Sequence, residues 1–245
     1  MVVVSMSKSK EEVEDELREL YDKLDPSVGL SPSFKYSKLN NIVVYKIEND
    51  YDVKIMITAR DSGVGMGKTT LAVLLAKEWS NYFGTTFDTD ENLYFDMQKY
   101  ADYYVDEASK GEVIVLDDVE QKLDARSYMS KINRKVSQML ALLRTKNVIT
   151  IFTCPNVGFL DRRVGELSDY QLLVRRRGVA VPYEFKIDDT SQKSWMRRLR
   201  NYKHSDKIGG TKEVILFGRY DGKELEIADN KKLEFAEKHF REIDS

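Results

Sequence analysis

Short, nearly continuous hydrophobic runs alternate along the chain with longer segments in which hydrophobic residues recur every three or four positions. The short runs predict strands buried on both faces of a sheet, and the longer segments predict amphipathic helices. The predicted strands are Ile42–Ile47, Val53–Thr58, Asn92–Phe95, Glu112–Leu116, Val148–Thr153, Tyr170–Val174, Val179–Ile187 and Glu213–Phe217. The predicted helices are residues 8–25, Thr70–Tyr82, Met97–Ser109, residues 130–145 and one from about Asn230, with Leu233, Ala236 and Phe240 facing inward. Because strands and helices alternate, we predict an α/β fold with a mostly parallel sheet.

The far end of the sheet has a different pattern. Arg177 and Gly178 separate the last two long predicted strands, and a connection this short joins antiparallel neighbours in a β-hairpin. We therefore expect three parts in the chain. Residues 1–41 form an N-terminal helical extension and linker, residues 42–190 form the α/β core, and residues 191–245 form a basic segment, a strand and a helix packed on that core.

A glycine-rich segment, Ser62-Gly-Val-Gly-Met-Gly-Lys-Thr69, lies between the predicted strand Val53–Thr58 and a predicted helix. A strand, the pattern G-x-x-x-x-G-K-[ST] and a helix make a phosphate loop, although Ser62 replaces the first glycine here. Backbone amides and Lys68 are expected to bind phosphate oxygens, and the Thr69 hydroxyl is expected to bind Mg²⁺. The sequence therefore predicts an ATP and Mg²⁺ site, against the alternative of a glycine-rich turn with an incidental lysine. The expected nucleotide contacts are Ser62, Gly63, Val64, Gly65, Met66, Gly67, Lys68, Thr69, Thr70 and Asn156.

Two acidic residues follow the hydrophobic run Val113–Leu116. A phosphate-loop enzyme needs a carboxylate at the tip of a neighbouring strand to hold hydrated Mg²⁺, and Asp117 is the candidate. Asp118 stands where many phosphate-loop ATPases carry a glutamate that polarises the attacking water. Aspartate is one methylene shorter, so Glu120 is the alternative for this role. Strand-end acids without a catalytic role are the competing interpretation of the pair.

A polar strand end follows in the segment Ile151-Phe-Thr-Cys-Pro-Asn156. Thr153 and Asn156 lie at the end of a strand that we expect to neighbour the strand of Asp117. A polar group there can hydrogen-bond the γ-phosphate or the attacking water. A turn built by Pro155 and Asn156 explains the same residues equally well.

Placed together, these elements resemble the additional-strand class of P-loop ATPases, which includes RecA-like, AAA+ and FtsK/HerA-type proteins. Residues 53–176 look most like viral and plasmid ATPases near the FtsK/HerA DNA pumps and the zonula occludens toxin-like phage proteins. The resemblance is carried by Ser62–Thr69, Val113–Asp118, Arg126–Ser130, Asn133, Leu143-Arg144, Val148–Asn156 and Leu160–Arg163. It implies a RecA-like P-loop NTPase fold, arranged as a three-layer sandwich. It also implies a Mg²⁺-dependent ATPase that translocates, packages or remodels DNA.

The same resemblance implies a ring of subunits with the nucleotide between them. In such a ring an arginine from one subunit stabilises charge on the γ-phosphate bound by its neighbour. Arg144 is the first candidate, and Arg126, Arg162 and Arg163 are the others. A cation that stabilises the C-terminal end of a helix is an equally good explanation of Arg144.

Three other functions compete with a DNA motor. AAA+ replication initiators and helicase loaders, such as DnaA-like proteins, carry a helical lid after the last core strand, whereas Tyr170–Ile187 is β-rich here. An ATP-switched DNA-binding protein with negligible turnover fits the aspartate at position 118 and the serine at position 62. A small-molecule kinase lacks support, because no acceptor site or arginine-rich lid pattern follows the core.

Basic residues concentrate between Lys131 and Lys212, with 18 Lys and Arg against 7 Asp and Glu. Clustered guanidinium groups suit phosphate contacts and the interleaved aromatic residues suit base stacking, so we expect sequence-nonspecific DNA binding here, against a solvated face or a subunit interface. The expected contacts are Arg175, Arg176, Arg177, Arg197, Arg198 and Arg200. The charged fraction of 33% favours a heat-adapted source. The single cysteine, Cys154, and the lack of a membrane-length apolar run favour the cytoplasm.

Overall fold

The computed structural model describes residues 29–60, 65–118, 146–154, 168–187, 194–201, 211–218, 220 and 222–243. The N-terminal helix predicted over residues 8–25 and the helix predicted over residues 130–145 lie outside these ranges. Within them, the elements match an α/β fold with a mostly parallel central sheet, as predicted.

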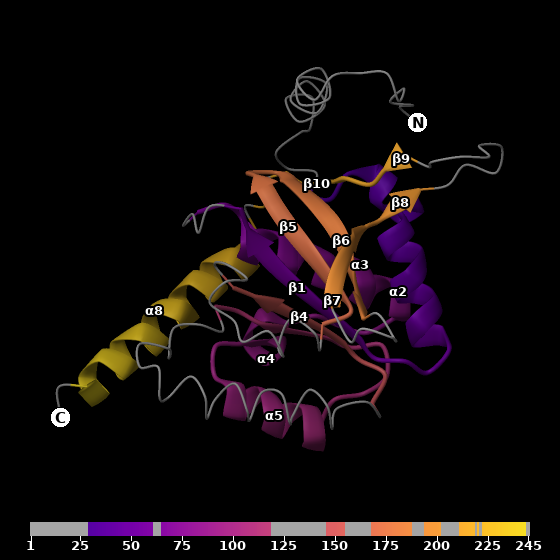
Figure 1. Cartoon of the computed structure of the whole chain (residues 1–245). Coiled ribbons are helices and arrows are strands. Elements are labelled where there is room, and N and C mark those ends of the chain that lie inside the picture. The colour runs from indigo at the N-terminus through magenta and orange to yellow at the C-terminus, as the bar shows by residue number, and fades with distance from the viewer. Residues whose placement is uncertain are drawn as a thin grey trace.

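Five parallel strands form the centre of the sheet, in the order β5-β1-β4-β3-β2 (Figure 1). Their bounds are β1 (Val53–Ala59), β2 (Leu93–Tyr94), β3 (Val113–Leu116), β4 (Ile149–Thr153) and β5 (Tyr170–Arg176). Strand β4 pairs with β1 on one side and with β3 on the other, so it separates the strand before the glycine-rich segment from the strand of Asp117. This arrangement confirms the predicted neighbour relation of the Thr153 and Asp117 strands.

Helices cover both faces of these strands and make three layers. On one face α2 (Lys38–Glu48) and α3 (Lys68–Phe83) bury their hydrophobic sides, and the largest core cluster runs from Leu39 through Trp79 to the strands. On the other face α5 (Met97–Asp106) packs Tyr100 and Tyr104 against a second cluster of strand residues. A short helix, α4 (Thr89–Asn92), leads into β2. The strands are buried on both faces, which explains their continuous hydrophobic runs.

The strand predicted over Ile42–Ile47 is wrong, because these residues belong to α2. Ser37 caps the helix by accepting a hydrogen bond from the Asn40 amide at 3.0 Å. Buried Leu39, Val43 and Ile47 recur every four positions and face α3 and the sheet. Helical periodicity and a cap therefore outweigh the β-branched composition of this segment. A short 3-10 helix, Pro32–Tyr36, precedes it.

The sheet continues beyond β5 with antiparallel strands. The turn at Arg177 and Gly178 joins β5 to β6 (Val179–Ile187), so the predicted hairpin is confirmed. Strands β7 (Ser194–Arg198) and β10 (Ile215–Leu216) each pair with β6, while β8 (Arg200–Asn201) and β9 (Thr211–Lys212) form a separate two-stranded sheet. The strand predicted over Glu213–Phe217 is thus shorter than expected, and Phe217 instead forms a bridge with Leu30.

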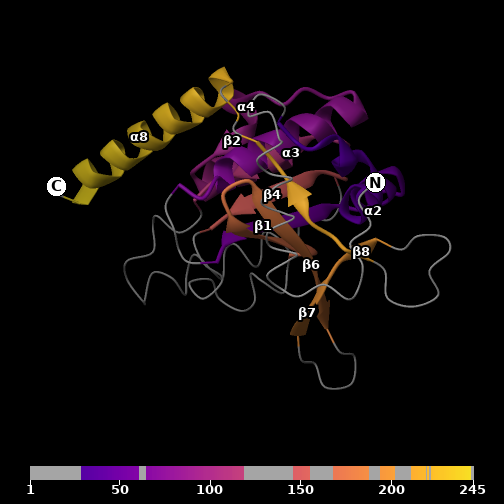
Figure 2. The ribbon, with the colours of Figure 1, turned by 90° about the horizontal axis from the view of Figure 1, so that it is seen from above.

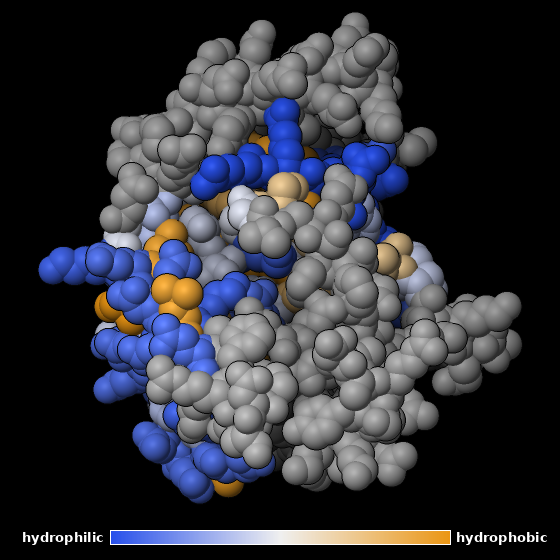
Figure 3. All heavy atoms as spheres, turned by 90° about the vertical axis from the view of Figure 1, so that its left-hand side faces the viewer, coloured by the Kyte–Doolittle hydropathy of each residue, from blue (hydrophilic) through white to orange (hydrophobic). Residues whose placement is uncertain are grey.

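The last helix, α8 (Lys223–Ile243), begins earlier than the predicted position near Asn230. Figures 1 and 2 show α8 running past α4 and α3, with its C-terminal end pointing away from the sheet. Leu233 is 62% exposed, so its predicted inward orientation is wrong, whereas Ala228, one turn and a half earlier in the helix, is buried. On the side of the molecule toward which α8 points, the described surface is mainly hydrophilic with small hydrophobic groups between (Figure 3). No helix in the described part of the chain is both long and apolar enough to cross a bilayer.

Candidate nucleotide-binding and catalytic site

The described part of the glycine-rich segment turns sharply into α3. Gly65 and Gly67 have φ angles of +80° and +85°, which favour glycine, and Gly67 is the N-cap of the helix. The Gly67 carbonyl accepts the first helical hydrogen bond, from the Leu71 amide at 2.9 Å. The amides of Lys68 and Thr69 therefore lie at the N-terminal end of a helix, where partial positive charge favours phosphate. Lys68, Thr69 and Thr70 are half-buried in its first turn.

The glycine-rich turn rests on the C-terminal part of the chain. A β-carbon at Gly67 would lie 3.2 Å from the ring of Phe217, which is itself 1% exposed. The turn therefore packs against Phe217, a residue far away in sequence, and the absence of a side chain at Gly67 permits this contact. Ser62, Gly63 and Val64 lie outside the described residues, so their predicted contacts stay predictions.

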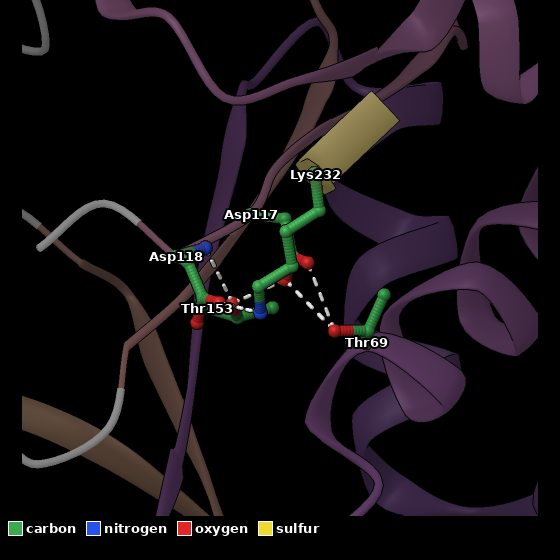
Figure 4. Close-up of polar contacts among 5 residues, drawn as sticks. All are labelled: Thr69, Asp117, Asp118, Thr153 and Lys232. Carbon is green, nitrogen blue, oxygen red and sulfur yellow. Dashed lines mark hydrogen bonds and ion pairs between the residues drawn. The ribbon is translucent and has the colours of Figure 1, made fainter. Parts of the chain in front are cut away.

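Thr69 contacts Asp117 across the boundary between α3 and β3 (Figure 4). The Thr69 hydroxyl lies 3.1 Å from Oδ1 and 2.9 Å from Oδ2 of Asp117. The Asp117 amide donates to the Tyr94 carbonyl at 2.8 Å, which ties the end of β3 to the end of β2. A helix-terminal hydroxyl and a strand-end carboxylate thus meet at one edge of the sheet, where the predicted Mg²⁺ site requires them.

Thr153, at the end of β4, joins the two aspartates. Its hydroxyl donates a hydrogen bond to Asp117 Oδ1 and accepts one from the Asp118 amide at 2.9 Å (Figure 4). Asp118 has a φ angle of +45°, a conformation that is rare for residues other than glycine, asparagine and aspartate. The backbone therefore leaves the extended conformation of β3 at Asp118, and the Thr153 hydroxyl holds the Asp118 amide at this point.

Asp117 is fully buried. Burial, followed by the negative charge of Asp118, raises the pKa of Asp117 above its usual range, while hydrogen bonds from Thr153 and Thr69 oppose the shift. The donor set fits a hard divalent cation, because carboxylate and hydroxyl oxygens are the ligands that Mg²⁺ takes in proteins. Mg²⁺ commonly takes one or two carboxylates together with waters and substrate phosphates, and a single buried carboxylate beside a phosphate-binding helix end fits that habit.

Lys232 of α8 reaches this site and forms an ion pair with Asp118 Oδ2 (Figure 4). Burial alone would lower the pKa of Lys232. The hydrogen bond and charge of Asp118 and the charge of Asp117 outweigh burial and raise this pKa, so Lys232 is positively charged. Sequence reasoning missed this residue. It lies 114 positions after Asp118, among the many lysines of an amphipathic helix, and no local pattern distinguishes it.

The remaining predicted catalytic residues cannot be placed. Asn156, Glu120, Arg144 and the other candidate arginines, Arg126, Arg162 and Arg163, all lie outside the described residues. Their assignments to the nucleotide, the attacking water and a neighbouring subunit stay predictions.

The six basic residues predicted to contact DNA do not form a single surface. Arg175, Arg198 and Arg200 are close enough to affect one another, and burial together with the charges of Arg175 and Arg200 lowers the pKa of Arg198. Arg175 also donates to the Tyr183 hydroxyl at 3.2 Å. Arg197 lies on the opposite face of β7 and forms an ion pair with Glu184 at 2.7 Å. Arg176 is half-buried, and Arg177 is exposed at the hairpin turn.

Part of the chain is similar to a known protein family. The model of the family AAA, "ATPase family associated with various cellular activities", matches residues 63–175, just under half of the chain. A comparison with curated protein sequences found no match. Among solved structures, the N-terminal domain of zonular occludens toxin from Neisseria meningitidis is 17% identical, with a TM-score of 0.35 over 62% of this chain and 95% of that one. A TM-score this low does not carry the similarity over to function. The AAA match, however, spans both the loop that leads into α3 and the strand end at Asp117, and on this basis the chain is a P-loop ATPase.

Proposed function

We propose that this ATPase requires Mg²⁺ and couples hydrolysis to the translocation, packaging or remodelling of DNA, acting as an oligomer. The observation that carries the proposal is the direct contact between Thr69 and Asp117, with β4 inserted between their supporting strands. This contact gives one edge of the sheet both a phosphate-binding helix end and a carboxylate for a metal ion. The same sheet continues into β5 and β7, which carry Arg175 and Arg198 of the arginine cluster.

In the proposed reaction, a water molecule attacks the γ-phosphate of ATP and ADP leaves. Lys68 and the amides of the glycine-rich turn bind the phosphates and neutralise their charge. Thr69 and Asp117 would hold Mg²⁺, which when bound supplies positive charge to the β- and γ-phosphate oxygens. Asp118 accepts a hydrogen bond from the attacking water and so orients it, and Asn156 lies near the γ-phosphate. Arg144 of a neighbouring subunit stabilises charge that develops on the γ-phosphate.

The DNA part of the proposal is supported by the cluster of Arg175, Arg198 and Arg200. Like charges that lie close together repel one another, and a bound anion would offset this repulsion. Binding of an anion such as a DNA phosphate is therefore the simplest physical explanation of the cluster. Trp195, on the same strand as Arg198 but on the face of Arg197, is 50% exposed. An exposed aromatic side chain near basic residues can stack on bases without reading their sequence.

Phosphate release from ATP by the purified chain tests the proposal, measured alone and with single- or double-stranded DNA. Lys68→Ala and Asp118→Asn serve as controls, and circular dichroism checks that both fold. We expect turnover that requires Mg²⁺, rises with DNA and falls at least about 100-fold in both variants. Wild-type turnover equal to that of Lys68→Ala, with and without DNA, would falsify the motor for the isolated chain.

A second candidate is an AAA+ replication initiator or helicase loader, favoured by the AAA match over residues 63–175. The described residues that follow this match form strands β6 to β10 and one long helix, α8, rather than a separate helical lid domain, which favours the first candidate. An ATP-switched DNA-binding protein with negligible turnover is a separate alternative. DNA binding that needs ATP, persists with a non-hydrolysable ATP analogue and occurs without phosphate release would support the switch over the motor.

A further inference from the structure

Helix α8 is fixed against the edge of the sheet where the two aspartates lie. Lys231 donates hydrogen bonds to the carbonyls of Thr89, Asp90 and Leu93 at 2.8, 2.7 and 3.1 Å. These carbonyls belong to α4 and the first residue of β2, so a single ammonium group ties α8 to the end of a short helix and to an edge strand. The rings of Phe95 and Phe235 stack at a centroid distance of 6.1 Å in the following turn of α8.

A second anchor holds the beginning of α8. Lys77 of α3 forms an ion pair with Glu224, and the Tyr220 hydroxyl donates to the same carboxylate at 2.8 Å. Helix α3 is the helix that begins at the glycine-rich turn. The position of α8 is therefore set from two sides, by the phosphate-binding helix at its start and by α4 and β2 at its middle.

Between these contacts, the side chain of Lys232 points to the end of β3 (Figure 4). Its ammonium group holds Asp118 Oδ2, while the Thr153 hydroxyl holds the Asp118 amide. The side chain of Asp118 is 13% exposed and that of Lys232 is 37% exposed. Both the backbone and the carboxylate of Asp118 thus have fixed partners, one from β4 and one from α8.

We propose that Lys232 is a positioning residue for Asp118, through which the placement of α8 sets the orientation of the carboxylate that activates water. This inference rests on the proposed function, since it needs Asp118 to act on the attacking water. An aspartate side chain is shorter than a glutamate side chain, so its carboxylate must be held in one orientation to reach the water. The ammonium group of Lys232 fixes this orientation. It also balances one of the two negative charges that lie side by side at the end of β3.

A merely structural ion pair would behave differently. Removing a structural pair lowers stability and leaves the chemical step as it was, whereas removing a positioning residue lowers kcat and leaves ATP binding nearly unchanged. Lys232 forms its ion pair with Asp118 rather than with Thr69 or Asp117, the two residues assigned to the metal, so its loss should leave nucleotide binding nearly unchanged. The effect of Lys232 should also disappear when Asp118 can no longer act.

The test measures kcat and KM for ATP in the full chain with Lys232→Met, Lys232→Arg, Asp118→Asn and the double variant Asp118→Asn with Lys232→Met. Lys223→Met is the matched control, because Lys223 is an exposed lysine at the start of the same helix. We expect Lys232→Met to lower kcat about 10- to 100-fold with KM changed by less than about 3-fold. Lys232→Arg should recover much of the loss, and the double variant should be no slower than Asp118→Asn alone.

Three results would overturn the inference while the proposed function survives. The first is a Lys232→Met variant with the kcat of wild type and of Lys223→Met, and the second is a kcat that rises, which would mean that Lys232 inhibits Asp118. A further loss in the double variant beyond that of Asp118→Asn would also show that Lys232 acts elsewhere. If the wild-type chain releases no phosphate at all, the proposed function fails first, and the inference fails with it. An ATP-dependent rise in the Tm of each variant shows that folding and nucleotide binding are intact.

Discussion

The parallel and antiparallel parts of the sheet differ in how they bury their residues. All described positions of β1, β3 and β4 are buried, and their side chains contact helices on both faces. Strand β7, at the opposite side, exposes Trp195, Met196 and Arg197. The candidate catalytic residues Asp117, Asp118 and Thr153 lie at strand ends of the parallel part, whereas the arginine cluster lies at the end of β5 and on β7 and β8.

This difference matches two tasks with different physical requirements. Hydrolysis needs groups held in place within a fraction of an ångström, and a strand packed on both faces gives that rigidity. Binding a long polyanion needs accessible charge and tolerates variation in position. The comparison therefore predicts that substitutions in the two parts have separable effects on stability, nucleotide binding and DNA binding.

The largest effect is expected from a core substitution in the parallel part. Ile151→Ala removes a fully buried side chain from the middle of β4 and should cost about 2–5 kcal/mol of unfolding free energy. Trp195→Ala in β7 removes a larger but half-exposed side chain and should cost less than about 1.5 kcal/mol. Urea unfolding of both variants measures the difference. Equal losses would mean that the two parts of the sheet are equally important to the core.

The next effect concerns the turn that precedes α3. Gly67→Ala forces a β-carbon into a left-handed backbone and to 3.2 Å from the ring of Phe217, so it should cost about 1–3 kcal/mol and weaken ATP binding. Gly84→Ala is the matched control. Gly84 has a φ angle of +70°, but a β-carbon there would meet nothing within 4 Å. Calorimetry with ATP should show weaker binding for Gly67→Ala alone, and equal affinities in the two variants would remove the role of the Phe217 contact.

A smaller effect is expected within the antiparallel part. Arg200→Ala removes an exposed member of the arginine cluster and should weaken DNA binding about 5- to 10-fold, and reduce the slope of log K against log salt by about 1. Arg197→Ala, on the opposite face and paired with Glu184, should change both quantities much less. Fluorescence anisotropy over a range of salt concentrations measures them. The DNA assignment of this cluster fails if the two substitutions have the same effect, or if neither changes the slope.

The smallest effect links α8 to α3 through pH. The hydrogen bond from Lys77 lowers the pKa of Glu224 from 4.5 to about 2. A lowered folded-state pKa means that the unfolded chain binds the proton more tightly. The ion pair therefore contributes fully above pH 4.5, and its contribution is lost as the pH falls toward 2.

Because both side chains are about a third exposed, the contribution is at most about 1 kcal/mol. Urea unfolding of wild type and Glu224→Gln at several pH values between 7 and 3 tests this prediction. The difference between them should be largest near neutral pH and shrink below pH 4.5. A difference that stays constant over this range would show that the carboxylate charge is irrelevant to the seating of α8.

Sequence patterns predicted the parallel part of the sheet well, because each of its strands is a short hydrophobic run without helical spacing. The prediction failed where a segment has both the composition of a strand and the residue spacing of a helix. Ile42, Val43 and Val44 have the composition of a strand, yet the four-residue spacing of Leu39, Val43 and Ile47 decides in favour of a helix. Strand β7 was missed, because Trp195–Arg200 looks like a basic surface segment, and its pairing with β6 depends on a tertiary contact rather than on local composition.

In the candidate site, the residues found from sequence are those that belong to a local pattern. Lys68 and Thr69 follow glycines, and Asp117 ends a hydrophobic run, so each has neighbours that mark it. Lys232 and Phe217 have no such neighbours. Their relation to Asp118 and Gly67 arises only when the C-terminal part of the chain packs against the sheet, and a single sequence contains no trace of that packing.

The position of β4 has a consequence for the order in which the chain can fold. Strands β1 and β3 are both made before β4, but each pairs with β4 and not with the other. During synthesis, the glycine-rich turn and Asp117 leave the ribosome before Ile149–Thr153. The two segments take their native positions only after Ile149–Thr153 has entered between their strands. The lysine of α8 arrives later still. Until β4 has emerged, a growing chain therefore cannot bring Thr69 and Asp117 together, and the edges of β1 and β3 stay available for wrong pairing.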